Sequence, residues 1–134
     1  MRRTSFAHMP CPIARALDAV GEWWSLLIIR ECFRGVRRFD DFHSGLGIAR
    51  NILASRLKAL VAAGILEKRS LPEEGRRRNE YCLTPKGEAM KPILLALGDW
   101  GNRYTDGQYM PPDGLSEHER NLAAQKLDQA EARS

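Results

Sequence analysis

The sequence predicts a mainly α-helical domain that carries one small β-hairpin. Apolar residues recur at helical spacing through most of residues 12–104. Two short segments, residues 65–71 and 80–84, alternate in part between apolar and polar residues, and a polar loop that contains glycine separates them. A chain of 134 residues has room for one compact domain and a short appendage.

Two helices are expected at the start of this domain. The first spans Pro12–Val20, because proline favours an opening turn and Gly21 favours a helix end. The second spans Trp23–Phe33 and ends before Gly35. It is apolar around most of its circumference, as expected of a central, buried helix.

A short helix, a turn and a long amphipathic helix follow. Residues 38–43 place Phe39 and Phe42 three positions apart on one helical face, and the composition of residues 44–47 predicts a turn. The long helix covers residues 48–63, and the next residue, a glycine, favours its end. Its apolar face carries Leu53, Leu57, Leu60 and Val61.

After the hairpin, Thr84 is expected to cap a further helix over residues 85–104, and Glu88 offers a second capping contact. The domain organisation that results has three parts. Residues 1–10 form an N-terminal arm, and residues 11–106 form the folded domain. Residues 107–134 form a linker rich in proline and glycine and a polar, frayed helical tail.

Composition argues for a cytoplasmic protein with no membrane partner. The longest apolar stretch, residues 23–29, is far shorter than the roughly 20 residues of a membrane span, and no secretion signal follows the N-terminus. The three cysteines are odd in number and widely spaced, which argues against disulfides and a structural metal. Residues 12–91 hold 15 Lys and Arg against 10 Asp and Glu, a basic excess that suits a polyanion.

Residues 38–78 contain the parts of a winged helix-turn-helix, in which the second helix of the motif enters the DNA major groove. The outward face of helix 48–63 is predicted to read DNA through Asn51, Ser55 and Lys58, with Arg50 at its edge. Asparagine pairs bidentately with adenine, arginine pairs with guanine, and lysine suits phosphate. The alternative is an ordinary solvated helix face.

Three consecutive arginines, Arg76, Arg77 and Arg78, are expected at the hairpin tip. Like charges repel there, so a phosphate backbone or a narrow minor groove is the favoured partner, and a solvated charge run is the alternative. Arg37 and Arg38 are candidate phosphate contacts, with a solubility role equally well supported.

Arg56 lies beside the apolar face of its helix, not opposite it. We therefore expect a structural role, in an ion pair with Asp40 or Asp41. A phosphate contact is the less favoured alternative.

An apolar stripe on the last helix has no obvious partner in so small a domain, which predicts a homodimer with N- and C-terminal dimerisation helices. A two-fold dimer would hold two recognition helices about 34 Å apart and would match a pseudo-palindromic operator. The predicted interface consists of Leu17, Val20, Ile93, Leu97, Trp100 and Tyr104.

Several motifs occur in a fixed order along residues 11–104: Cys11-Pro12, GEWWSLLIIR at 21–30, Arg37-Arg38-Phe39, LKAL at 57–60, AGIL at 63–66 and YCLTPKG at 81–87. Together they resemble the HxlR family of bacterial regulators, within the winged-helix group that includes the MarR proteins. The resemblance implies a dimeric regulator that binds double-stranded DNA. The family usually has Ser-Pro where this chain has Ala49-Arg50, and loss of that cap costs about 1 kcal/mol.

The resemblance also implies a sensor, because some relatives answer to electrophiles or oxidants through the cysteine that matches Cys11. This residue precedes Pro12 at a helix N-terminus, where free amides favour a thiolate. The alternative is a small structural residue. Cys32 and Cys82 are expected to be buried and inert, and any other small-molecule effector is unknown.

An enzyme is the main rival class, but His8, His43 and His118 are scattered, and no GxSxG, Walker or HExxH motif occurs. We therefore expect no catalytic residue, no cofactor and no metal. A second rival is a winged helix used only for protein contacts. It predicts a neutral or acidic wing, in contrast to the basic residues at 76–78.

Overall fold

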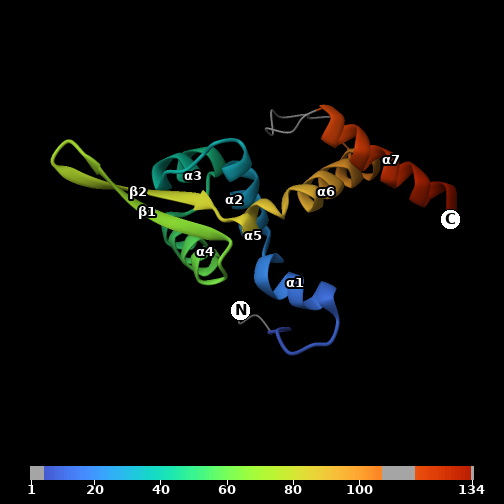
Figure 1. The fold of residues 1–134 in the computed structure, drawn as a ribbon, viewed down its shortest axis with the longest axis horizontal. Coiled ribbons are helices and arrows are strands. Elements are labelled where there is room, and N and C mark those ends of the chain that lie inside the picture. Colours follow the sequence, from blue (N-terminus) through green and yellow to red (C-terminus); the bar gives the residue numbers. More distant parts are fainter. Residues whose placement is uncertain (1–4, 107–116, 134) are drawn as a thin grey trace.

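The computed structural model describes residues 5–106 and 117–133. A helical body of α1 to α4 is followed by a β-hairpin, and the hairpin projects from one end of the molecule (Figure 1). Helices α6 and α7 lie at the opposite end. The predicted class, mainly α with one hairpin, is confirmed. The elements are α1 Pro12–Val20, α2 Trp23–Phe33, α3 Phe39–Leu46, α4 Arg50–Ala62, β1 Leu66–Glu73, β2 Arg76–Leu83, α5 Pro85–Glu88, α6 Lys91–Tyr104 and α7 Glu117–Arg133.

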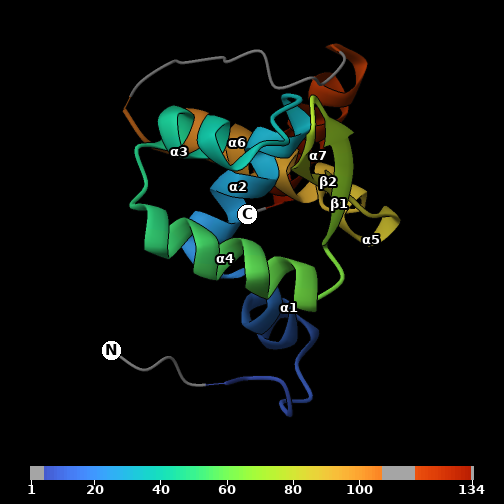
Figure 2. The ribbon, with the colours of Figure 1, turned by 90° about the vertical axis from the view of Figure 1, so that its left-hand side faces the viewer.

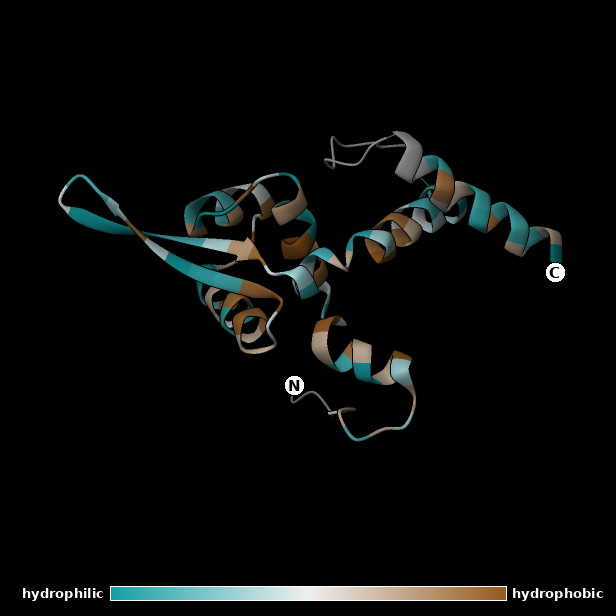
Figure 3. Ribbon diagram, in the orientation of Figure 1, coloured by the Kyte–Doolittle hydropathy of each residue, from teal (hydrophilic) through white to brown (hydrophobic). Residues whose placement is uncertain are grey.

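The hydrophobic core lies where α2, α3 and α4 meet the base of the hairpin. Helix α2 runs between α3 and α4 (Figure 2), and its Ile28 and Ile29 are fully buried. Hydrophobic residues lie on the parts of these elements that face the core. Further hydrophobic residues lie on α1 and α6, outside the core (Figure 3). The buried side chains pack as one cluster, which includes Phe42, Ile48, Leu53, Leu57, Leu60, Ile65 and Leu66.

The turn between α3 and α4 is shorter than predicted. Residues 44–46 continue α3, and only Gly47, with a left-handed φ of 65°, reverses the chain. Ile48 is buried in the core instead of starting the next helix, and α4 begins at Arg50. Its N-cap is Ala49, which makes no side-chain capping hydrogen bond.

The hairpin is longer and its loop shorter than the sequence predicted. Strands β1 and β2 each have eight residues and pair antiparallel from Leu66 opposite Leu83 to Glu73 opposite Arg76. The turn is the dipeptide Glu74-Gly75, with φ of 38° and 76°; two positive φ values suit a tight hairpin. The arginine run therefore belongs to strand β2 and not to a tip loop.

The long helix predicted over residues 85–104 is two helices in the structure. Thr84 caps the short helix α5, as predicted, by accepting a hydrogen bond from the amide of Gly87 at 3.1 Å. The break falls at Ala89 and Met90, and Pro92 lies in the first turn of α6. Proline lacks the amide hydrogen that a helix interior needs, so it begins a new helix here.

Helix α7, the predicted helical tail, packs along α6. Arg103 of α6 bridges Asp128 at 2.6 Å and Glu131 at 3.1 Å, and the Tyr104 hydroxyl donates to Glu131. The predicted linker at 107–114 lies outside the described residues. No described helix is long and apolar enough to cross a lipid bilayer.

Candidate nucleic-acid interface

Helix α4 has one face in the core and one face in solvent. Leu53 and Leu57 are fully buried, whereas Asn51, Ser55 and Lys58 are exposed. None of these three polar side chains makes a hydrogen bond or ion pair with a described residue. They are therefore available to an external partner, as the helical periodicity predicted.

Arg50 lies at the first turn of α4, against α3. Its guanidinium forms an ion pair with Asp40 at 3.0 Å and lies 5.8 Å from the centre of the Phe39 ring. Both charged side chains are mostly exposed, with 61% and 81% of their surface accessible. An exposed pair contributes about 0–1 kcal/mol, so Arg50 can exchange Asp40 for a stronger anion at low cost.

Arg56 has a structural partner, but not one of the two that were predicted. Its Nε lies 3.6 Å from the carboxylate of Glu22, and neither Asp40 nor Asp41 pairs with it. Glu22 is the N-cap of α2 and accepts a hydrogen bond from the Ser25 amide at 3.1 Å. The pair thus ties α4 to the start of the central helix, a contact between distant residues that periodicity alone could not identify.

Arg78, the third residue of the arginine run, is bound within the protein. It is half-buried and forms ion pairs with Glu73 at 3.1 Å and Glu80 at 2.7 Å. Glu73 also pairs with Arg38 at 3.1 Å, so this cluster fastens the start of α3 to the hairpin. Arg38 and Arg78 consequently have a structural use that the sequence did not predict.

Arg76 and Arg77 lie near the turn on opposite faces of the strand, because side chains alternate along β2. Arg77 donates hydrogen bonds to the hydroxyl and the carbonyl of Ser70, both at 2.7 Å. The Arg76 side chain is exposed and makes no ion pair or hydrogen bond with a described residue. These two residues therefore supply the positive charge beside the turn, next to the exposed Glu74 in the turn itself.

Arg37 lies away from the wing tip. It was predicted, together with Arg38, as a candidate phosphate contact. Its backbone carbonyl accepts a hydrogen bond from the Tyr81 amide at 2.8 Å, which joins the loop before α3 to β2. Its side chain lines a cavity beside Cys32 and Cys82. Sequence reasoning missed this cavity because its walls come from four separate segments.

The predicted dimer surface is exposed except for one residue. Val20 is only 8% exposed and belongs to the core of its own chain, because α1 packs on α2 at that point. Ile13 of α1 and Trp23 of α2 were not predicted, yet about 70% of each is exposed. The remaining predicted residues, Leu17, Ile93, Leu97, Trp100 and Tyr104, are each about half exposed.

The three thiols lie in different surroundings. Cys11 is exposed and occupies the N-cap position of α1. Burial raises the pKa of the Cys32 thiol to about 12, and the neighbouring Cys82 and Glu31 add to the shift. Cys32 is therefore a neutral thiol at physiological pH and a poor nucleophile. Among the described residues, no group of three or more His, Cys, Asp or Glu side chains could hold a metal ion.

A helix, a tight turn, a second helix with an exposed polar face and a basic hairpin together define the class of winged helix-turn-helix proteins. Residues 19–109 match the family described as HxlR-like helix-turn-helix. The chain belongs to this family of transcriptional regulators, as its motifs predicted.

Individual relatives agree with this assignment. An uncharacterized HTH-type transcriptional regulator of Mycobacterium tuberculosis is 42% identical over 109 residues, which cover 79% of this chain and 66% of that relative. The chain thus spans just under two thirds of that relative's length. The crystal structure of the putative transcription factor PA1607 superposes with a TM-score of 0.68 at 43% identity, covering 81% of this chain and 73% of that one. The structure of the redox regulator HypR in its reduced form superposes with a TM-score of 0.64 at 29% identity. The match covers 70% of this chain and 95% of that one.

Proposed function

We propose that this protein is a homodimeric regulator of transcription that binds double-stranded DNA at a specific, pseudo-palindromic operator. The observation that carries the proposal is the exposed polar face of α4, flanked by the basic wing. Asn51 and Ser55 supply groups that read base edges, and Lys58, Arg76 and Arg77 supply charge for phosphates. A winged helix used only for protein contacts would have no need of this combination.

The apolar surface of α1 and α6 supports the dimer. Five large apolar side chains of these helices are half exposed, and the ring centroids of Trp100 and Tyr104 lie 5.6 Å apart on α6. A patch of this kind on a small soluble protein marks a contact with another macromolecule. A second copy covers it symmetrically and places two recognition helices on successive turns of DNA.

Cys11 is proposed as the site through which an electrophile or oxidant acts. Its thiol is exposed at the first turn of α1, beside the proposed dimer surface, whereas Cys32 and Cys82 are partly buried. A modification there would alter the packing of α1 and thereby the spacing of the two recognition helices. A structural neighbour named as a redox regulator, HypR, supports this assignment.

The dimer is tested by placing a charge in the middle of the patch. We expect the wild type to sediment as two chains at micromolar concentration and Leu97→Glu to sediment as one, because a buried carboxylate without a partner opposes association. Gln125→Glu, an exposed change on α7, is the control and should remain dimeric. A monomeric wild type that still binds its operator tightly would contradict the proposal.

The wing is tested by the salt dependence of DNA binding. Replacing Arg76 and Arg77 together by glutamine should lower the slope of log K against log salt by about 0.9 for each phosphate that is no longer neutralised, on operator and random DNA alike. Arg78→Gln removes the same charge from the same strand, but its guanidinium already pairs with Glu73 and Glu80, so its slope should stay near that of the wild type. Equal slopes for all three proteins would show that the wing does not touch phosphate.

Base reading is tested at Asn51. Selection from random duplexes supplies the operator, and Asn51→Ala should then weaken operator binding by about 1–3 kcal/mol while random DNA binds nearly as before. Lys58→Ala is the matched change on the same helix face and should weaken both DNAs to a similar degree. If Asn51→Ala also weakens both equally, Asn51 contacts the backbone and Arg50 or Ser55 reads the bases.

The thiol response is tested with diamide on reduced protein, followed by an operator titration. We expect diamide to change the operator affinity of the wild type but not that of Cys11→Ser, because the exposed thiol reacts first. Cys82→Ser should respond like the wild type. If wild type and Cys11→Ser respond alike, or neither responds, Cys11 is not the sensor.

A further inference from the structure

The two faces of the wing differ in charge. Side chains alternate along each strand, and residues paired across the hairpin share a face, so the register assigns every charged residue to one face or the other. One face carries Lys68 and Arg77 and no carboxylate. The other face carries three arginines and three glutamates: Arg69, Arg76, Arg78, Glu67, Glu73 and Glu80. The second face therefore has no net charge, although most of the arginines of the wing lie on it.

Glu73 is the carboxylate of this balanced face that also reaches α3. One of its oxygens, Oε1, accepts a hydrogen bond from Arg38 and another from Arg78, both at 3.1 Å. Arg78 has a second carboxylate, Glu80, at 2.7 Å. Among the described residues, Arg38 has no ion-pair partner except Glu73. The charge of Arg38 is therefore balanced by this one carboxylate, whereas Arg78 would keep a partner without it.

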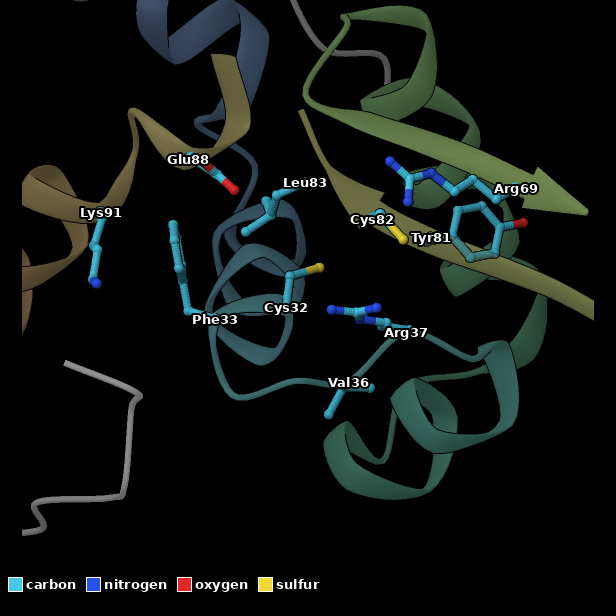
Figure 4. A pocket seen from close by; sticks show the side chains of 10 residues that line it. All are labelled: Cys32, Phe33, Val36, Arg37, Arg69, Tyr81, Cys82, Leu83, Glu88 and Lys91. Carbon is cyan, nitrogen blue, oxygen red and sulfur yellow. The ribbon is translucent and has the colours of Figure 1, made fainter. Parts of the chain in front are cut away.

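Arg38 occupies a position that suits a phosphate contact. It is the N-cap residue of α3, the first helix of the helix-turn-helix, and in such motifs the first helix crosses the DNA backbone. Its side chain is 42% exposed. The preceding residue, Arg37, instead lines the cavity beside Cys32 and points toward that sulfur (Figure 4). Arg38 is thus the arginine of this pair whose charge lies at the wing.

We propose that Glu73 withholds Arg38 from the DNA backbone and so limits the sequence-independent part of DNA binding. The proposal rests on the DNA-binding function proposed above. A phosphate that approached the Arg38 guanidinium would also approach the Glu73 carboxylate, which lies 3.1 Å from it. Attraction and repulsion of similar size then nearly cancel, and little is gained from the contact.

The pair of Arg50 and Asp40 shows why the position of Glu73 matters. The Asp40 side chain is 81% exposed and has no second cation, so it can turn into solvent when a phosphate takes its place. Glu73 is only 32% exposed and is held from a second side by Arg78, so its charge stays where it is. Arg50 can therefore serve DNA, whereas Arg38 remains neutralised.

A withheld phosphate contact favours selective binding by a regulator. Contacts to phosphate strengthen binding to every duplex, because all DNA presents the same backbone. An operator competes with a large excess of other sequences in a genome. With one phosphate contact fewer in each subunit, the base-reading groups on the exposed face of α4 account for a larger share of the affinity.

The fold does not depend on the charge of Glu73. The Tyr81 amide donates a hydrogen bond to the Arg37 carbonyl at 2.8 Å, and this backbone contact joins α3 to the wing independently of the ion pair. Glutamine has the shape of glutamate, and ion pairs between partly exposed side chains contribute little to stability. We therefore expect Glu73→Gln to unfold thermally close to the wild type.

The test measures binding of the full chain to a random-sequence duplex over a range of salt concentrations. Glu73→Gln should bind about threefold or more tightly than the wild type, and its slope of log K against log salt should steepen by about 0.9 per subunit. Glu74→Gln removes the same charge from the next residue, which forms no ion pair with a described residue, so its slope should stay near that of the wild type.

The part played by Arg38 is isolated by a double-mutant cycle. Arg38→Gln should leave the slope nearly unchanged in the wild type, where the guanidinium is already engaged, but should return Glu73→Gln to the wild-type slope. Unchanged or weaker binding of random DNA by Glu73→Gln would reduce the ion pair to a structural contact and overturn the proposal. A gain that persists after Arg38→Gln would also overturn it, because the effect would then come from the lost negative charge alone. A wild type that binds neither random DNA nor an operator overturns the proposed function instead.

Discussion

The carbonyl group of Ile65 joins α4, the wing and the helices that follow. It accepts a hydrogen bond from the Thr84 amide at 3.1 Å, and the Thr84 hydroxyl also lies 3.1 Å away. Gly87 packs so closely that a Cβ atom there would lie 2.2 Å from the same oxygen. Because Ile65 follows α4 and Thr84 follows the last strand of the wing, this junction constrains how α4 and the wing are oriented relative to α6. A partly buried carbonyl without these donors would cost about 1–3 kcal/mol, so the arrangement is strongly constrained.

The sequence predicted the ends of a helix correctly where a single residue, such as a proline or a glycine, determines the position at which the helix begins or ends. Helix α1 has the predicted bounds, because proline fits a first turn and the chain leaves the helix at Gly21. Boundaries that depend on tertiary packing were missed. Gly45 suggested a turn, but the helix continues through it because Phe42 and Leu46 on either side pack into or against the core. Pro72 suggested a loop, yet it lies in a strand, since the tight turn beyond it extends the pairing.

The features of the candidate site also fall into two groups: those that local sequence predicts and those that depend on contacts between distant segments. The exposed face of α4 follows from helical periodicity, a property of neighbouring residues, and the structure agrees with it. Ion pairs between distant segments could not be predicted, because an arginine can reach any carboxylate that the fold brings near. Arg56 with Glu22 and Arg38 with Glu73 are both of this kind. The cavity beside Cys32 is a stronger case, since its residues come from three helices, a loop and both strands and share no sequence pattern.

The two-residue turn of the wing also limits how this protein can diverge. Side chains alternate between the faces of the hairpin, so inserting one residue in a strand would exchange the faces on which Arg76 and Arg77 lie. An insertion between Glu73 and Arg78 would also disturb the ion pairs that link Arg78, Glu73 and Arg38. Insertions in matched pairs, one residue in each strand, keep the register and move the tip outward by about 3.4 Å per pair. Two such pairs restore the original faces, so wing lengths among descendants of this sequence should change in discrete steps and not continuously.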